Sequence, residues 1–143
     1  MSVTEIPKIK FCYEHWVNNV SWKDTGAYDY MLKSVIKKGE HDGCKNFEDI
    51  IKRYEELDLI FDQVKKEGRL RTRKEINPGN FRGSGEVIIH IGPDGEIYFE
   101  GEGGGNHRFA IDYILKLLLP AQVGCIHKSA IQYLSKQRKR YIF

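Results

Sequence analysis

Residues 86–110 read EVIIHIGPDGEIYFEGEGGGNHRFA, and the expected architecture follows from this stretch. The segments 86–91 and 96–100 are rich in β-branched and aromatic residues, which are common in strands. Gly92-Pro93-Asp94-Gly95 between them is a strong turn signal, so the two segments predict a β-hairpin. A glycine-rich turn then leads to Asn106, where an amphipathic segment typical of a helix begins.

The downstream sequence continues this alternation of elements. The helix that begins at Asn106 is expected to end near Leu118, because Pro120 cannot continue it. After Pro120 the pattern predicts a short buried strand over 121–126 and a helix over 129–136.

Two helices are expected upstream. The first runs over 27–37 and ends at Gly39. The second runs from Asn46, a typical N-cap, to Gly68 and carries the clearest apolar stripe in the chain. Residues 1–21 mix aromatic and polar side chains without a clear period, so we expect them to wrap over the body as irregular chain.

This order of elements predicts an α+β fold with a small mixed sheet. Helices come first, and a β-hairpin is then followed by helix, strand and helix. We expect an N-terminal helical portion, residues 1–75, packed on a core formed by residues 76–143. A chain of 143 residues has room for one compact domain.

Composition narrows the class of protein. Hydrophobic residues make up 41% and charged residues 30%, as in soluble globular proteins. No apolar run approaches the roughly 20 residues of a membrane span, and residues 1–11 have no apolar block or small-residue cleavage site typical of a secretory signal. We therefore expect a cytoplasmic protein without a membrane partner. The three cysteines are odd in number and widely spaced, so we expect them to be reduced.

Charge is distributed unevenly although the net charge is only +3. Residues 113–143 carry six Lys or Arg and no Asp or Glu, and residues 65–74 form a second basic patch. Between 83 and 106 there are carboxylates and no Lys or Arg. Basic patches suit phosphates or nucleic acid, and carboxylates suit a divalent metal or general-base chemistry, but solvated surfaces look the same.

The most informative motif is the turn from Gly101 into the helix at Asn106. The first turn of a helix presents unpaired backbone N–H groups, and glycines let a ligand approach the backbone closely. Together they favour a phosphate or another anion, for which His107 and Arg108 would add side-chain donors. His107 could also act as a catalytic residue by shuttling a proton. A tight connection in which these two residues only pack or pair with nearby glutamates explains the pattern equally well.

The segment Gly104-Gly105-Asn106-His107-Arg108-Phe109-Ala110 resembles the signature of the ParB/sulfiredoxin superfamily. In sulfiredoxins the corresponding residues read Gly-Gly-Cys-His-Arg-Tyr. Leu119-Pro120-Ala121-Gln122-Val123 is similar to the leucine, proline and short strand that close the family's unit. The resemblance covers about residues 84–128. Asn106 stands where sulfiredoxins have a catalytic cysteine, so sulfinic-acid reduction is not expected.

The resemblance implies a ParB/sulfiredoxin-like fold that binds a nucleoside triphosphate, ATP or CTP, with Mg²⁺. The family's phosphate-binding positions correspond to Gly104, Gly105, Asn106, His107 and Arg108. By the same resemblance the protein would be a kinase-like phosphotransferase acting on a small-molecule acceptor, or a nucleotide hydrolase.

Two carboxylates and a histidine are the remaining candidates. Glu100 and Glu102 flank the turn, and either could act as a base, with Glu102 the candidate metal ligand, or both could be solvated. His127 ends the last predicted strand, either at the edge of the pocket or in a structural role. Two other functions stay open. One is a ParB-like nucleic-acid-binding or nuclease module, and the other is a non-catalytic interaction domain.

Overall fold

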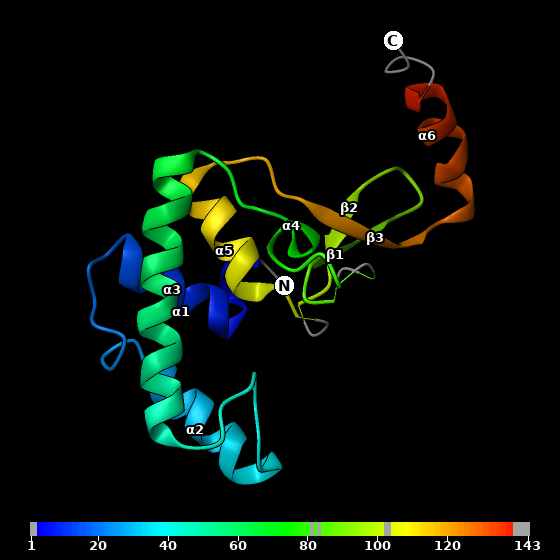
Figure 1. Cartoon of the computed structure of the whole chain (residues 1–143). Coiled ribbons are helices and arrows are strands. Elements are labelled where there is room, and N and C mark those ends of the chain that lie inside the picture. The colour runs from blue at the N-terminus through cyan, green and yellow to red at the C-terminus, as the bar shows by residue number, and fades with distance from the viewer. Residues whose placement is uncertain (1–2, 81, 83, 102–103, 139–143) are drawn as a thin grey trace. The chain divides into compact units, whose positions relative to one another are not determined.

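The structure is a computed structural model that describes residues 3–80, 82, 84–101 and 104–138 (Figure 1). The chain divides into two compact units. The helical unit comprises residues 1–70 and 106–119, and the sheet unit comprises residues 71–105 and 120–143. The segment 106–119 belongs to the helical unit, although it was expected in the C-terminal core.

The helical unit holds a short 3₁₀ turn and four α-helices (Figure 1). Both α1 and α3 pack against α5, and α2 packs against α3. The elements are η1 (Val3–Glu5), α1 (Pro7–Trp16), α2 (Ala27–Lys38), α3 (Phe47–Glu67) and α5 (Asn106–Leu115).

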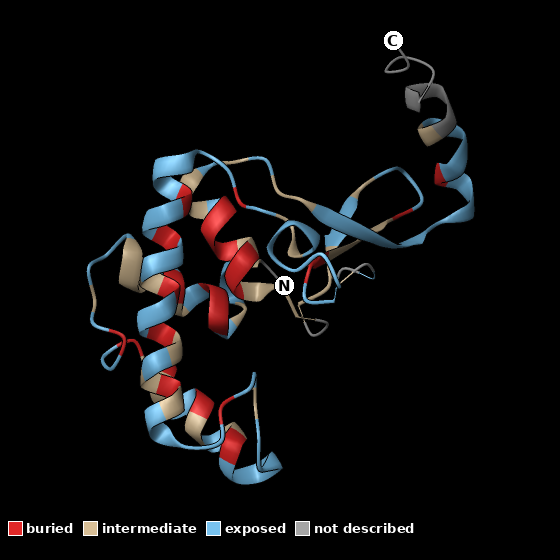
Figure 2. Cartoon of the chain, viewed as in Figure 1, coloured by how far each residue is buried: buried red, intermediate tan, exposed pale blue. Residues whose placement is uncertain are grey.

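Helix α3 confirms the clearest helix prediction from the sequence. The Asn46 side chain caps it by accepting a hydrogen bond of 2.9 Å from the backbone N–H of Asp49. Gly68 ends it with φ 71°, a left-handed conformation that favours glycine. Figure 2 shows buried residues along one side of this helix, and these are Ile50, Tyr54, Leu57, Phe61 and Val64.

Helix α1 was not expected, because residues 1–21 were interpreted as irregular chain. Pro7 stands at its first turn, where a missing N–H costs nothing. Ile9, Cys12 and Trp16 lie on the face that packs inward. Lys8 is also buried, and this polar residue interrupts the apolar period by which a helix is recognised.

Aromatic rings form much of the core of the helical unit. Trp16 stacks on Phe61 with ring centroids 4.3 Å apart, and Trp22 contacts Tyr54 at 4.7 Å. The Asp58 carboxylate accepts hydrogen bonds from both indole N–H groups, at 2.9 and 3.0 Å. This carboxylate therefore fixes the two tryptophans against α3.

The sheet unit holds a three-stranded sheet with short helices. The strand order is β2-β1-β3, with β1 and β2 antiparallel and β1 and β3 parallel. The predicted hairpin, the third strand and the α+β class with a mixed sheet are thus confirmed. The elements are α4 (Arg73–Ile76), β1 (Val87–Ile91), β2 (Ile97–Phe99), β3 (Ala121–Ile126), η2 (Lys128–Ala130) and α6 (Ile131–Arg138).

Three details differ from the sequence prediction. Helix α4 was missed, although Thr72 and Glu75 form a complete capping box at its start. Helix α5 ends at Leu115 and not at Leu118, because Lys116 takes a left-handed conformation with φ 55°. Strand β3 was expected to be buried, but all six of its residues are exposed (Figure 2).

Among the described residues, no helix is both long enough and apolar enough to cross a membrane. Cys12 and Cys44 are buried and Cys125 is exposed, and all three are free thiols as the sequence predicted. Burial raises the pKa of Cys12, so this thiol stays protonated at neutral pH.

Candidate functional site

Gly104 and Gly105 precede α5, and the structure requires glycine at the two positions to different degrees. Both have positive φ, 102° at Gly104 and 73° at Gly105. A Cβ at Gly105 would lie 2.9 Å from Val87 Cα and 3.0 Å from the Glu86 carbonyl oxygen, so close packing within the sheet unit requires glycine here. Among the described residues, no atom lies within 4 Å of the position that a Cβ at Gly104 would take.

His107 lies in the first turn of α5 and is buried, with 7% of its surface exposed. Its ring meets the Tyr54 ring edge-on at a centroid distance of 5.7 Å. Burial, together with the charges of Arg53 and Lys8, lowers the pKa of His107 to about 3. The imidazole is therefore neutral at physiological pH and offers one donor and one acceptor.

Three residues from other elements surround a single carboxylate near His107. Lys8 Nζ donates to Asp42 Oδ2 in a close ion pair. Arg53 donates from Nη1 to the Asp42 carbonyl at 3.2 Å, and its Nη2 lies 3.8 Å from Asp42 Oδ2. His41 Nε2 lies 3.9 Å from the same carboxylate oxygen. We call Lys8, His41, Arg53 and His107, with Asp42 among them, the basic cluster.

The carboxylate in the basic cluster is ionised. Burial opposes this ionisation, but the hydrogen bond and charge of Lys8 and the charge of Arg53 outweigh it and lower the pKa of Asp42. Burial also lowers the pKa of His41, with help from Lys8. Two permanent cations therefore face one anion, and the formal charge of the cluster is +1 at neutral pH.

Several buried polar atoms at the basic cluster have no hydrogen-bond partner among the described residues. They are His41 Nε2, Arg53 Nε, Tyr54 Oη and His107 Nε2. Tyr54 is fully buried, and burial raises the pKa of its hydroxyl, which therefore remains a neutral donor. Buried polar atoms are normally paired, so a set of unpaired ones beside two cations is unusual.

Arg108 belongs to a different environment from His107. It is buried, with 7% exposed, and its charge acts on Asp112 one turn further along α5. Burial raises the pKa of Asp112 to about 6, although Arg108 opposes this rise. His107 and Arg108, predicted to hold one phosphate together, thus have different electrostatic partners in the helical unit.

The other predicted site residues lie in the sheet unit. Glu100 Oε2 accepts a hydrogen bond of 2.9 Å from His90 Nε2, and His90 Nδ1 accepts one of 3.0 Å from the Cys125 backbone N–H. The histidine therefore joins β3 to the end of β2. His127 Nδ1 lies 2.8 Å from the Ser129 hydroxyl, in the cap of η2. Glu102 lies outside the described residues.

Sequence reasoning did not select Lys8, Asp42 or Tyr54 as site residues. Lys8 and Asp42 are 34 residues apart, so only the fold brings them together. Tyr54 lies in the buried stripe of α3. A hydroxyl on the buried face of a helix, next in sequence to Arg53, was the one feature of the sequence that could have indicated a polar site here.

Comparison with protein-family models, curated proteins and solved structures gave no match.

Proposed function

We propose that the basic cluster binds a phosphate group and that the protein is a nucleotide-binding protein. The single observation that carries the proposal is the set of unpaired buried polar atoms, including His107 Nε2 and Tyr54 Oη, beside the cations of Lys8 and Arg53. His107 also stands in the first turn of a ten-residue helix, whose N–H groups and dipole favour an anion.

Each group has a distinct part in this proposal. The Arg53 side chain is partly exposed and can turn its guanidinium to an arriving phosphate, because its contacts with the described residues of the cluster are a 3.2 Å hydrogen bond to the Asp42 carbonyl and a 3.8 Å ion pair. Tyr54 and neutral His107 donate hydrogen bonds without adding charge. Asp42 keeps Lys8 in place and sets a limit on the bound negative charge, because like charges repel.

The nucleotide class rests on the resemblance of residues 104–110 to ParB/sulfiredoxin proteins. That resemblance supports ATP or CTP as the ligand, Mg²⁺ as its counterion, and phosphoryl transfer to a small acceptor or hydrolysis as the reaction. The described residues contain no group of three or more His, Cys, Asp or Glu that could hold a metal ion.

Thermal unfolding tests the proposal with ATP, CTP, GTP, ADP and pyrophosphate, each with and without Mg²⁺. A ligand at 100 times its Kd stabilises the folded state by about 2.7 kcal/mol and raises Tm. We expect such a rise for at least one nucleotide, and a reduced rise in Tyr54→Phe. Tyr30→Phe, on the exposed face of α2, is the matched control and should respond like the parent protein.

The Tyr54→Phe variant separates binding from folding. Without ligand it should be as stable as the parent or more stable, because a buried hydroxyl without a partner is removed. A stable Tyr54→Phe protein that keeps the full response to nucleotide would contradict the placement of the phosphate. Absence of a rise with every ligand would remove the proposal of nucleotide binding.

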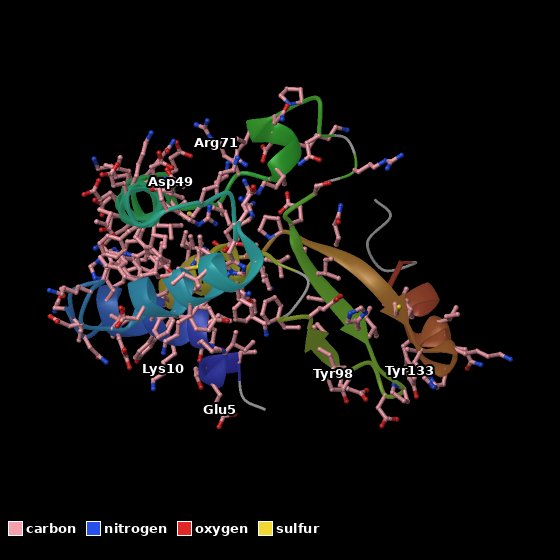
Figure 3. The ribbon with its side chains drawn as sticks, turned by 90° about the horizontal axis from the view of Figure 1, so that it is seen from below. Glu5, Lys10, Asp49, Arg71, Tyr98 and Tyr133 are labelled. Atoms are coloured by element: carbon pink, nitrogen blue, oxygen red, sulfur yellow. The ribbon has the colours of Figure 1, made fainter. Side chains whose placement is uncertain are left out.

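A second candidate function is that of a non-catalytic interaction domain, and the exposed strands of the sheet unit favour it. All six residues of β3 are exposed, and Ile97 on β2 is 68% exposed. Figure 3 shows the side chains of Tyr98 on β2 and Tyr133 on α6, which are 54% and 57% exposed. If these strands pair with a second copy, sedimentation should show association that increases with concentration and weakens in Val123→Lys. Identical monomeric behaviour of both proteins would count against it.

A further inference from the structure

A cavity of 740 Å³ lies within the helical unit, apart from the basic cluster. Its wall is formed by the end of α1, by α5 and by the residues that follow α5 up to Leu119. The volume is in the range of small-molecule sites in proteins, which is roughly 300–1,000 Å³. No residue of the basic cluster lines this cavity, so a ligand here is independent of the proposed phosphate site.

The wall of the cavity is mostly apolar. Aromatic rings from α1 and α5 and aliphatic side chains near the end of α5 line it, and these include Tyr13, Phe109, Tyr113, Ile114, Leu117 and Leu119. The rings of Phe109 and Tyr113 stack with their centroids 5.9 Å apart, and Tyr13 and Tyr113 are 41% and 46% exposed. Apolar surface that is open to water around a cavity is stabilised when an apolar molecule covers it. The lining therefore favours a ligand with an apolar body.

Lys116 is the charged side chain of the wall that a ligand can contact. Among the described residues that line the cavity, only Asp112 and Lys116 carry a charge. Asp112 is 1% exposed and its carboxylate oxygens are shielded from solvent, so they offer a ligand no contact. The charge of Arg108 also opposes that of Asp112. Lys116 is exposed, and its ammonium group attracts a negatively charged group.

The backbone of Lys116 is a second, independent sign of function. Lys116 follows the last residue of α5 in a left-handed conformation with φ 55°, which residues other than glycine seldom adopt. Glycine is the usual residue at such a helix end, as Gly39 and Gly68 are after α2 and α3. A lysine here lowers stability, and residues kept in such conformations are concentrated at ligand sites.

We propose that this cavity binds a hydrophobic monocarboxylate, and that Lys116 pairs with its carboxylate group. The apolar body of the ligand covers the rings and aliphatic side chains of the wall. A single negative charge is expected, because the described lining residues offer one exposed cation. A phosphate or a second carboxylate would lie near the Asp112 charge without a further cation to balance it.

Calorimetric titration with decanoate, 1-decanol and decylamine tests the inference, because these probes share one apolar chain and differ in the charge of the head group. We expect saturable binding of decanoate at one site per chain. Decanol should bind about fivefold more weakly, because it lacks the ion pair with Lys116, and decylamine more weakly still, because like charges repel. Lys116→Gln should remove the preference for decanoate over decanol, and Lys116→Arg should keep it, because arginine retains the charge.

Lys37→Gln is the matched control, since this lysine is exposed on α2, and it should keep the affinities of the parent protein. Val17→Trp places a large side chain at the cavity wall and should weaken decanoate and decanol together. Lys116→Gly separates the side chain from the fold. It relieves the positive φ and should raise Tm without ligand, and it should still lose the preference for decanoate.

Four results would overturn the inference. One is the absence of saturable decanoate binding to the folded parent protein. Another is equal affinity of the parent protein for decanoate and decanol, which would leave the charge of Lys116 without a role. The third is an unchanged preference for decanoate in folded Lys116→Gln or Lys116→Gly. The fourth is unchanged decanoate affinity in folded Val17→Trp, which would place the ligand outside this cavity.

Discussion

Asp112→Asn should stabilise the protein at neutral pH, and the size of the effect should depend on pH. The native carboxyl is buried and has no hydrogen-bond partner among the residues that the structure describes. Burial raises the pKa of Asp112 from 3.8 to about 6, so ionisation is harder in the folded than in the unfolded chain. Asparagine has nearly the same shape and cannot ionise.

The magnitude follows from linkage between protonation and folding. A pKa raised from 3.8 to about 6 corresponds to about 3 kcal/mol, at about 1.4 kcal/mol for each pH unit. Below pH 3.8 the carboxyl is protonated in both states and this cost is absent. Between pH 3.8 and about 6 the unfolded chain ionises first and stability falls. Above about pH 6 the full cost is present.

Urea unfolding followed by tryptophan fluorescence measures the effect, because Trp16 and Trp22 both lie in the core of the helical unit. The difference in unfolding free energy between Asp112→Asn and the parent protein should rise by about 2–3 kcal/mol from pH 4 to pH 7.5. Other titrations are common to both proteins and cancel. Asp62→Asn, on the exposed side of α3, is the control substitution. A flat difference for Asp112→Asn would refute the reasoning.

Three further predictions test other parts of the structure. The His107→Gln variant should lose less stability than the parent protein between pH 7 and pH 4. The pKa of His107 is lowered to about 3 in the folded parent, so on acidification the unfolded chain takes up the proton first and the parent is destabilised. Equal losses of unfolding free energy in urea titrations at the two pH values would contradict this. Gly105→Ala should lower the unfolding free energy by more than about 2 kcal/mol, because the added Cβ would clash with β1. Gly68→Ala should lower it by about 1 kcal/mol, because Gly68 also has a positive φ but an added Cβ would meet no described atom within 4 Å. Similar losses for the two variants in urea unfolding would contradict the packing role of Gly105. Asp58→Ala should cost about 2 kcal/mol and alter tryptophan fluorescence, since two indole N–H groups lose their acceptor; an unchanged spectrum would disprove that role.

Local signals explain which parts of the fold could be predicted from the sequence. Asn46 and Gly68 define the ends of α3 through caps whose chemistry is local. Gly92-Pro93-Asp94-Gly95 likewise defines the hairpin, whose register pairs Ile91 with Ile97. In each case the few residues that determine the geometry are adjacent, so no tertiary contact is needed to recognise them.

Helix α1 and the basic cluster could not be predicted for the opposite reason. Lys8 is buried because Asp42, 34 residues away, neutralises it. Without that partner in view, a lysine at an inward position argues against an apolar helix face. The motif did lead to His107, but the sequence suggested an exposed phosphate-binding donor, and the structure gives a buried neutral ring.

Helix α5 carries two perturbed titratable groups, and one physical cause acts on both. Burial disfavours the charged form, so it lowers the pKa of His107 to about 3 and raises that of Asp112 to about 6. A helix selected only for stability would carry apolar side chains here, because removing unpaired buried polar groups stabilises a protein. Perturbed groups of this kind concentrate at functional sites. A substitution at position 107 should therefore preserve or increase stability at neutral pH while it weakens nucleotide binding, and that combination distinguishes a functional residue from a merely structural one.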